Sequence, residues 1–351
     1  MKGYKSLAFA FLLVTLFGFS GRAQTTSVTG PAPLSQSPAS GSRRSAIPPE
    51  DWNALSVKSL ALRPLPPVVT EHDVKPSYNR DIVRVQWRPG DSIELFVYTP
   101  HNVTKAPAIL YLYSYPSDVD RFYDEGWATR ATADGYAAVG FVSALTGVRY
   151  HTRPMKEWFV SNLQESIGSS VHDVQMILNY LDTRGDIDMD RIGMFGQGSG
   201  GAIAILAASV DARIQALDLL DPWGDWPDWL KDSPQVPDTE RSNYLKPEFL
   251  QQLTNLDPVT YLPQLKIRNL RIQQVLTDPV TPKSARDRIA AASPSPGVLR
   301  RFPDTEAHFT AMRSSGVSGW LKGRLENPPA VKNAAPQRAA GIAPSSTTAQ
   351  N

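Results

Sequence analysis

Continuous apolar runs alternate with amphipathic stretches through the middle of the chain. Two strand-like runs, 81–87 and 92–100, flank Arg88-Pro89-Gly90-Asp91 and predict a hairpin. The later apolar runs are typical of strands that are buried on both faces; they are 108–114, 135–142, 191–195, 214–220, 269–277 and 297–302. Helical character or spacing predicts helices at 121–134, 161–184, 199–209, 282–292 and 308–325. This alternation predicts an α/β fold whose mostly parallel, doubly wound sheet carries helices on both faces.

The segment 221–265 interrupts the alternation after the sixth predicted strand. It is too long for an ordinary connection, so we expect a lid-like insertion over the top of the sheet. Ligands bind at the carboxyl ends of the strands in such folds, and the insertion starts there. Its first nine residues contain three tryptophans at a spacing of three, Trp223, Trp226 and Trp229. Pro222, Gly224 and Pro227 favour an irregular loop. The three indole rings either form a platform for a sugar or an aromatic ligand or, more simply, form a hydrophobic plug that holds the insertion to the domain.

Both ends of the chain differ in composition from the middle. Residues 1–23 have a basic start, a short apolar stretch and a cleavage site at Gly21-Arg22-Ala23, which predicts a signal peptide and export to the periplasm or the medium. Residues 24–50 and 327–351 are rich in small and polar residues, and we expect them to be a disordered spacer and a disordered tail. One domain, 52–326, lies between them.

Composition excludes several classes of function. The 351 residues include no cysteine, which rules out disulfides, a thiol nucleophile and a lipid-modified cysteine after the signal. The formal net charge is +2, from 36 basic and 34 acidic residues. This near balance offers no electrostatic case for binding nucleic acid or an acidic membrane surface. No membrane association is expected once the signal peptide is removed.

The stretch "DRIGMFGQGSGG" (190–201) places a strand, a tight glycine turn and a small-residue helix in succession. This is the context of a nucleophile elbow, in which a strained turn presents a serine to the active site. The stretch resembles the elbow of the α/β-hydrolase superfamily, and in particular the dienelactone hydrolase, acetyl xylan esterase and prolyl-oligopeptidase-like groups. Those groups show "RIG", two apolar residues, and Gly-x-nucleophile-x-Gly-Gly. The resemblance covers most of 80–325 and implies an α/β-hydrolase fold.

The register of the elbow decides which residue stands at the nucleophile position. If Gly196, Gly200 and Gly201 are the frame glycines, the apex is Gly198, which has no side chain. The N–H of Ser199 would then serve an oxyanion hole while its hydroxyl caps the helix. If Ser199 is instead the displaced nucleophile, a bulky Gln197 and Gly201 become the frame residues. The glycine register favours the first interpretation, and the second stays open.

The same resemblance implies an acid and a base. Asp278 in "LTDPVTP" corresponds to the acid after the seventh strand of the family, although the stretch is also an ordinary Asp-Pro turn. His308 follows the last predicted strand, where the family places its catalytic histidine. In an active enzyme it would take the proton of Ser199 while the carboxylate orients the ring. The N–H groups of Tyr115 and Gly200 would hold the oxyanion.

Two functions from different classes follow from these residues. The chain is either a serine hydrolase of ester or other acyl bonds, or a hydrolase-fold protein that binds a ligand without acyl-enzyme chemistry. A purely structural export module is a third possibility. The substrate or ligand would be a small molecule, a glycan or an ester. We expect no cofactor, because "GQGSGG" lacks the nucleotide-binding frame, and no metal, because the aspartates of 221–228 match no calcium loop.

Overall fold

A computed structural model describes residues 50–116, 119–145, 149, 159–295, 298–313 and 318–326. The predicted signal peptide, the predicted tail and all but the last residue of the predicted spacer lie outside the described residues. None of the helices in the described part has both the length and the apolar character that crossing a membrane requires.

Nine strands form one sheet in the order β1-β2-β3-β5-β4-β6-β7-β8-β9. The strands are β1 Val68–Val74, β2 Tyr78–Arg88, β3 Asp91–Pro100, β4 Ala106–Leu112, β5 Ala137–Gly140, β6 Ile187–Gln197, β7 Ile214–Leu220, β8 Asn269–Val275 and β9 Leu299–Phe302. Pairing is antiparallel from β1 to β3 and between β3 and β5, and it is parallel from β5 through β4 to β9. The predicted fold class is therefore confirmed, including the hairpin at Gly90.

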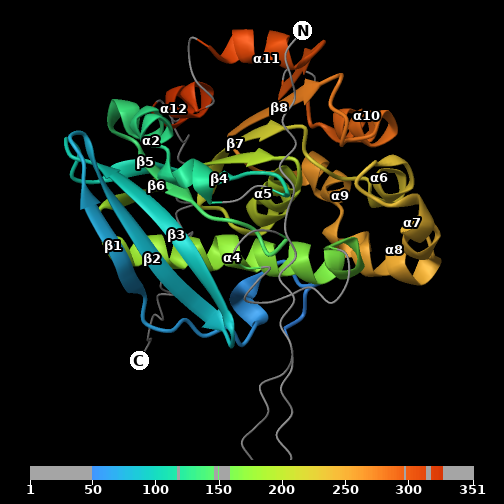
Figure 1. The fold of residues 1–351 in the computed structure, drawn as a ribbon, viewed down its shortest axis with the longest axis horizontal. Helices are drawn as coiled ribbons and strands as arrows, with labels where there is room; N and C mark the ends of the chain where they lie inside the picture. The colour runs from blue at the N-terminus through green and yellow to red at the C-terminus, as the bar shows by residue number, and fades with distance from the viewer. Residues whose placement is uncertain are drawn as a thin grey trace, which may run out of the picture. The chain divides into compact units, whose positions relative to one another are not determined.

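Helices cover both faces of this sheet (Figure 1). They are α1 Asp120–Tyr123, α2 Glu125–Thr132, α4 Leu163–Arg184, α5 Ser199–Val210, α6 Trp226–Asp232, α7 Asp238–Tyr244, α8 Pro247–Leu253, α9 Pro258–Tyr261, α10 Lys283–Ala292, α11 Thr305–Met312 and α12 Gly319–Glu326. Short 3₁₀ turns lie at Val57–Ser59, Ala133–Gly135, Phe159–Asn162, Thr254–Leu256 and Leu262–Gln264. Helices α4 and α5 pack on one face, and α2 and α12 pack on the other.

The central strands are apolar on both faces because each face meets a helical layer. Successive residues of β4 alternate between the two cores: Leu110 and Leu112 pack with α4 and α5, while Ile109 packs with α2 and α12. All three side chains are fully buried. Since the side chains of a strand point alternately to opposite faces, a strand between two helical layers must be continuously apolar.

Three differences from the predicted elements have local causes. Strand β1 was not predicted, because six of its seven residues are exposed at the edge of the sheet and its sequence shows no apolar alternation. The stretch 121–134 is interrupted at Asp124, whose side chain accepts a hydrogen bond from the Trp127 N–H and caps α2. The predicted closing helix 308–325 is two helices, α11 and α12.

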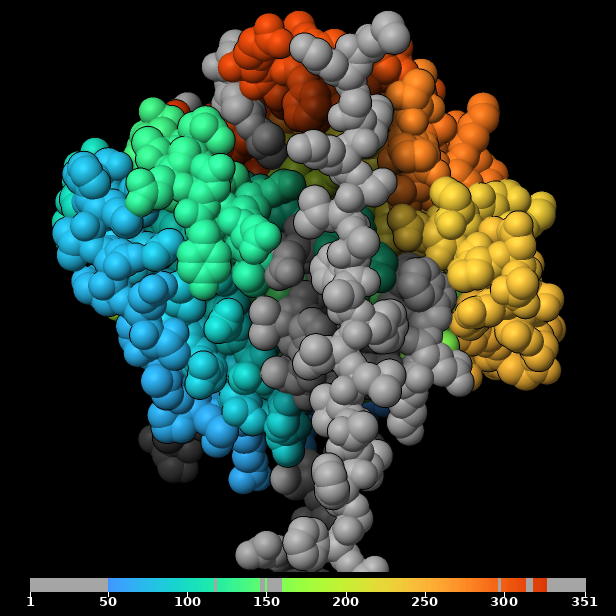
Figure 2. All heavy atoms as spheres, viewed as in Figure 1, coloured from blue at the N-terminus to red at the C-terminus, as the bar shows by residue number. Residues whose placement is uncertain are grey.

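The predicted insertion consists of short helices between β7 and β8. Because β1 was missed, β7 is the sixth of the predicted strands but the seventh strand of the sheet. Helices α6 to α9 follow one another within it, and they form the yellow and light-orange group of side chains on one side of Figure 2. Strands β1 to β3, coloured from blue to cyan, occupy the other side of that view.

Candidate functional site

The chain turns from β6 into α5 at Gly198. Its backbone angles are φ 52° and ψ −116°, outside the regions that residues with side chains favour, and it is the N-cap residue of α5. The Gly198 N–H donates to the Leu220 carbonyl at 2.9 Å, and its own carbonyl accepts from the Gly201 N–H at 3.0 Å. The strained position of the turn is thus held by a glycine, which tolerates it without a steric cost.

The neighbouring glycines are required by close packing. A Cβ on Gly200 would lie 2.7 Å from the Leu112 carbonyl carbon, and one on Gly201 would lie 2.8 Å from Pro222 Cβ. A Cβ on Gly196 would lie 2.7 Å from the Gly200 carbonyl oxygen. The strand-to-helix turn is therefore as tight as the glycine pattern predicts.

Ser114 fills the space above Gly198. A Cβ built on Gly198 would lie 2.6 Å from Ser114 Cβ, still closer to Ser114 Oγ, and 3.1 Å from Trp223 Nε1. Ser114 lies in the loop that follows β4, on a different part of the chain from the elbow. Its hydroxyl group therefore occupies the volume into which a nucleophile side chain at position 198 would project.

Ser199 is the first residue of α5, and its side chain is fully buried. Its Oγ accepts a hydrogen bond from the Tyr115 N–H at 2.9 Å, and its own N–H donates to Ser114 Oγ at 3.4 Å. The hydroxyl does not cap α5, contrary to the expectation that accompanied the Gly198 register. The Tyr115 N–H, which was predicted to bind the oxyanion, therefore donates to the hydroxyl group of Ser199, the alternative nucleophile.

Asp278 and His308 lie in different surroundings. Asp278 follows β8, and its Oδ2 accepts from the Thr281 N–H at 2.8 Å. His308 lies in α11, is only 6% exposed, and packs its ring edge-on against Phe302 with 5.0 Å between ring centres. Among the described residues, His308 Nε2 has no hydrogen-bond partner. Burial lowers the pKa of His308, and the positive charge of Arg271 lowers it further.

A pocket of about 390 Å³ opens above Gly198 at the carboxyl ends of the strands. It is lined by Tyr113, Ser114, Tyr115, Pro116, Arg121, Gln197, Gly198, Asp221, Trp223, Gln235, Asp278, Val280 and Thr281. The structure thus brings Asp278, Tyr115, Gln197 and Gly198 together at one pocket. His308 and the buried Ser199 are not among its lining residues.

Asp221 is a pocket residue for which the sequence pattern predicted no role. It follows β7 with a positive φ of 44°, and its Oδ1 accepts from the Val275 N–H at 2.8 Å. Burial, together with the nearby charge of Asp278, raises the pKa of Asp221 to about 7. The available signal was its place directly after a buried strand, the same signal that selected Asp278.

Stability should depend on pH through Asp221. A carboxyl whose folded pKa lies above its ordinary value contributes stability that is complete below the ordinary pKa and is lost as the pH rises through about 7. We therefore expect Asp221→Asn to gain on the order of 2 kcal/mol relative to the wild type between pH 4 and pH 8. Urea unfolding at both pH values measures this difference. Asp190→Asn, at an exposed position, is the control, and an equal gain there would contradict the assignment.

The three tryptophans of the insertion form a buried stack. Each is at most 1% exposed, and ring centres lie 4.5 Å apart for Trp223 and Trp229 and 5.9 Å apart for Trp226 and Trp229. This burial agrees with the hydrophobic plug and not with an open sugar platform, although Trp223 also reaches the pocket wall. The expected irregular loop was wrong for 226–232, because Pro227 stands in the first turn of α6, where its missing N–H costs no hydrogen bond.

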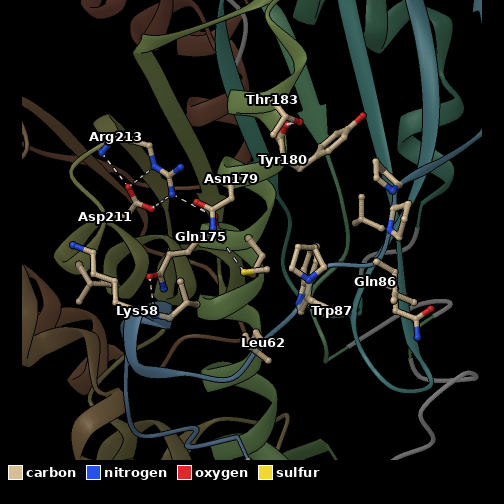
Figure 3. A pocket seen from close by; sticks show the side chains of 18 of the residues that line it. Lys58, Leu62, Gln86, Trp87, Gln175, Asn179, Tyr180, Thr183, Asp211 and Arg213 are labelled. Carbon is tan, nitrogen blue, oxygen red and sulfur yellow. Dashed lines mark hydrogen bonds and ion pairs between the residues drawn. The ribbon is translucent and has the colours of Figure 1, made fainter.

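A larger cavity of about 990 Å³ lies away from the elbow, between residues 57–67, β2 and α4 (Figure 3). Its polar side chains bond mainly to one another or to nearby backbone. The Arg213 guanidinium pairs with Asp211, and the Gln175 amide contacts the backbone of Leu55 and Val57. Few polar groups remain to orient a ligand there, so the pocket above Gly198 is the stronger candidate.

The described residues contain no group of three or more His, Asp or Glu side chains that could hold a metal ion. The side chains that line the pocket above Gly198 offer two carboxyl groups, four hydroxyl groups (two of them phenolic), two amides and one guanidinium.

The strand order, the elbow turn and the acid-bearing loops after β7 and β8 define an α/β-hydrolase fold. Solved structures of that fold are similar to this chain. Acetyl xylan esterase 1 from Thermoanaerobacterium sp. JW/SL YS485 is 16% identical, with a TM-score of 0.58 over 75% of this chain and 90% of that one. The acetyl xylan esterase from Paenibacillus sp. R4 is 19% identical, with a TM-score of 0.59 over 78% and 92%.

A longer protein shares the same fold. The Pyrococcus horikoshii acylaminoacyl peptidase is 14% identical, with a TM-score of 0.51 over 74% of this chain, which spans 48% of that protein. No protein-family model and no curated protein matches the sequence. At these identities the similarity establishes the α/β-hydrolase fold and leaves the activity to the site.

Proposed function

We propose that this chain binds a small ligand in the pocket above Gly198 and does not form an acyl-enzyme at Ser199. One observation carries the proposal: the buried Ser199 hydroxyl accepts the N–H of Tyr115, so the alternative nucleophile fills the predicted oxyanion hole. A substrate carbonyl would need that N–H free and the hydroxyl exposed. Both conditions would require Ser199 to leave its present position.

The serine-hydrolase alternative also needs a general base near Ser199. A base must come within hydrogen-bonding reach of the proton that it removes. His308 makes its ring contact with Phe302 and experiences the charge of Arg271, while Asp278 bonds to Thr281 at the pocket. The predicted triad would therefore have to assemble by a rearrangement of α11.

The polar atoms of the pocket favour a ligand that donates hydrogen bonds. Asp221 and Asp278 each use one carboxylate oxygen to accept a backbone N–H, and their other oxygens have no partner within the described chain. The Gln197 amide and the aromatic side chains of Tyr115 and Trp223 complete the walls. Hydroxyl groups on a compact ring would satisfy both the free oxygens and the aromatic surface. Because similar structures are acetyl xylan esterases, an acetylated xylo-oligosaccharide is the first ligand to test.

Binding without turnover distinguishes the two functions in one preparation. We expect acetylated xylotriose to bind by calorimetry, and Asp278→Asn to weaken it by about tenfold, the usual loss for one hydrogen bond to a charged group. No acetate should be released, and a fluorophosphonate probe should leave Ser199 unmodified. An active serine esterase in the same assay is the positive control. If the probe instead labels the peptide that contains Ser199, and both Ser199→Ala and His308→Ala abolish this labelling, the chain is a serine hydrolase.

We also propose that the protein is exported. The support is the arrangement of residues 1–23, with a basic start, an apolar stretch and small residues at the cleavage site. In a host that recognises the signal, the mature protein should begin at Gln24, as read by N-terminal sequencing of the periplasmic fraction and the medium. A chain that retains residues 1–23 and stays with the cells would contradict export.

A further inference from the structure

A third pocket has four arginines among its eight lining residues. Its volume is about 310 Å³, and its lining residues are Arg268, Asn269, Leu270, Arg271, Val298, Arg300, Trp320 and Arg324. We call it the arginine pocket. It lies at the amino-terminal ends of β8 and β9, whereas the pocket above Gly198 lies at the carboxyl ends. The length of β8 separates the two by roughly 20 Å.

Only part of this positive charge is neutralised within the fold. Arg271 forms a two-pronged ion pair with the buried Asp218, with N···O distances of 2.8 and 2.5 Å. Neither Arg268 nor Arg324 makes an ion pair with an acidic side chain of the described chain. Guanidinium groups that share one small pocket repel one another, so the pocket costs free energy unless an anion occupies it.

The indole N–H of Trp320 and the side-chain NH₂ of Asn269 add hydrogen-bond donors to the pocket. Within the described part of the chain, no protein group accepts from the Trp320 indole N–H or from the Asn269 side-chain amide. Two guanidinium groups lie over the Trp320 ring, with Arg271 Cζ 5.0 Å and Arg324 Cζ 5.6 Å from its centre. These cation–π contacts hold guanidinium groups at the pocket in fixed orientations.

We propose that the arginine pocket binds an oxyanion group: phosphate, sulfate or carboxylate. Guanidinium groups match the paired oxygens of such groups, and an amide and an indole N–H add further donors. The volume exceeds that of a single inorganic ion, so the oxyanion belongs to a larger ligand whose remainder lies against Trp320. This site is independent of the proposed function of the pocket above Gly198.

The test compares anions at equal ionic strength on the full chain. Inorganic phosphate, sulfate and acetate are each titrated by calorimetry and by thermal unfolding, with chloride as the reference. We expect binding that chloride does not reproduce, and the strongest of the three anions identifies phosphate, sulfate or carboxylate chemistry. Arg268→Gln with Arg324→Gln should weaken that binding by about tenfold or more, because two charge-assisted contacts are lost.

A matched control is Arg84→Gln, which removes an exposed arginine from β2, far along the sheet order from β8. It should leave anion binding unchanged. At low salt and without anion, the double variant should unfold at a higher temperature than the wild type, because the arginine repulsion is relieved. Arg324→Gln alone gives the same comparison if the double variant folds poorly. The proposal would be overturned if the wild type and the folded arginine-pocket variants bound the anion equally well. It would also be overturned if the wild type bound none of the three anions more tightly than chloride.

Discussion

Gly198→Ser by itself should destabilise the protein by about 2–5 kcal/mol, because it combines backbone strain with overpacking. The new side chain would start at φ 52° and would overlap Ser114, whose Cβ lies 2.6 Å from the built Cβ. The second substitution Ser114→Gly removes the overlapping atoms and should restore a large part of the loss. Urea unfolding of the single and double variants measures both effects.

Gly185→Ser separates the two causes. Gly185 also has a positive φ, 79°, but a Cβ there meets nothing within 4 Å. Gly185 has the ordinary left-handed conformation, with ψ −17°, so its substitution should show the cost of a positive φ without a steric overlap, about 1–2 kcal/mol. If Gly198→Ser is no more harmful than this control, Ser114 does not occupy the position of the missing side chain. The same conclusion follows if the double variant recovers nothing.

The double variant also tests what the site lacks. If the nucleophile is the only missing part, the folded Gly198→Ser and Ser114→Gly variant should hydrolyse p-nitrophenyl acetate. We expect no such gain, because neither His308 nor another histidine lines the pocket above Gly198 in the described structure. A gain that also disappears with His308→Ala would show that α11 brings its histidine to the pocket in solution.

Trp229→Ala should cost about 3–5 kcal/mol, the usual range for removing a large aromatic side chain from a core. Trp229 is fully buried and contacts both other rings of the stack. The variant should also weaken ligand binding, since Trp229 supports Trp223 at the pocket wall. Thermal unfolding and calorimetry with the same ligand measure the two consequences.

Trp229→Phe is the matched control, because Trp229 Nε1 has no hydrogen-bond partner in the described structure. Phenylalanine keeps much of the buried surface and removes an unpaired donor, so its cost should be well below that of alanine. Trp226→Phe should be worse than Trp229→Phe, because Trp226 Nε1 donates to the Leu256 carbonyl at 2.8 Å. A Trp229→Ala variant of unchanged stability but lost ligand binding would favour the sugar platform over the plug.

The fold class and the outline of the elbow could be predicted from the amino-acid pattern alone. Buried parallel strands are continuously apolar, helices show apolar spacing, and both signals are local. The glycines at 196, 200 and 201 predicted close packing. In the structure Gly200 packs against Leu112 and Gly201 packs against Pro222. The predictions failed at the exposed strand β1 and at the helix break at Asp124. Strand β1 has no alternation of apolar and polar residues, and the break depends on a side-chain cap and not on helical apolar spacing.

Which groups meet at the site depends on contacts between distant parts of the chain. Ser114 and Tyr115 contact Ser199 from 85 and 84 residues away, and no periodicity encodes such a contact. Asp221 reaches the pocket because β7 lies between β6 and β8 in the sheet, whereas His308 packs its ring against Phe302 at the end of β9. Strands and helices follow from contacts between near residues, but a pocket follows from how distant segments pack. The residue types were therefore visible in the sequence, while their partners were decided by the fold.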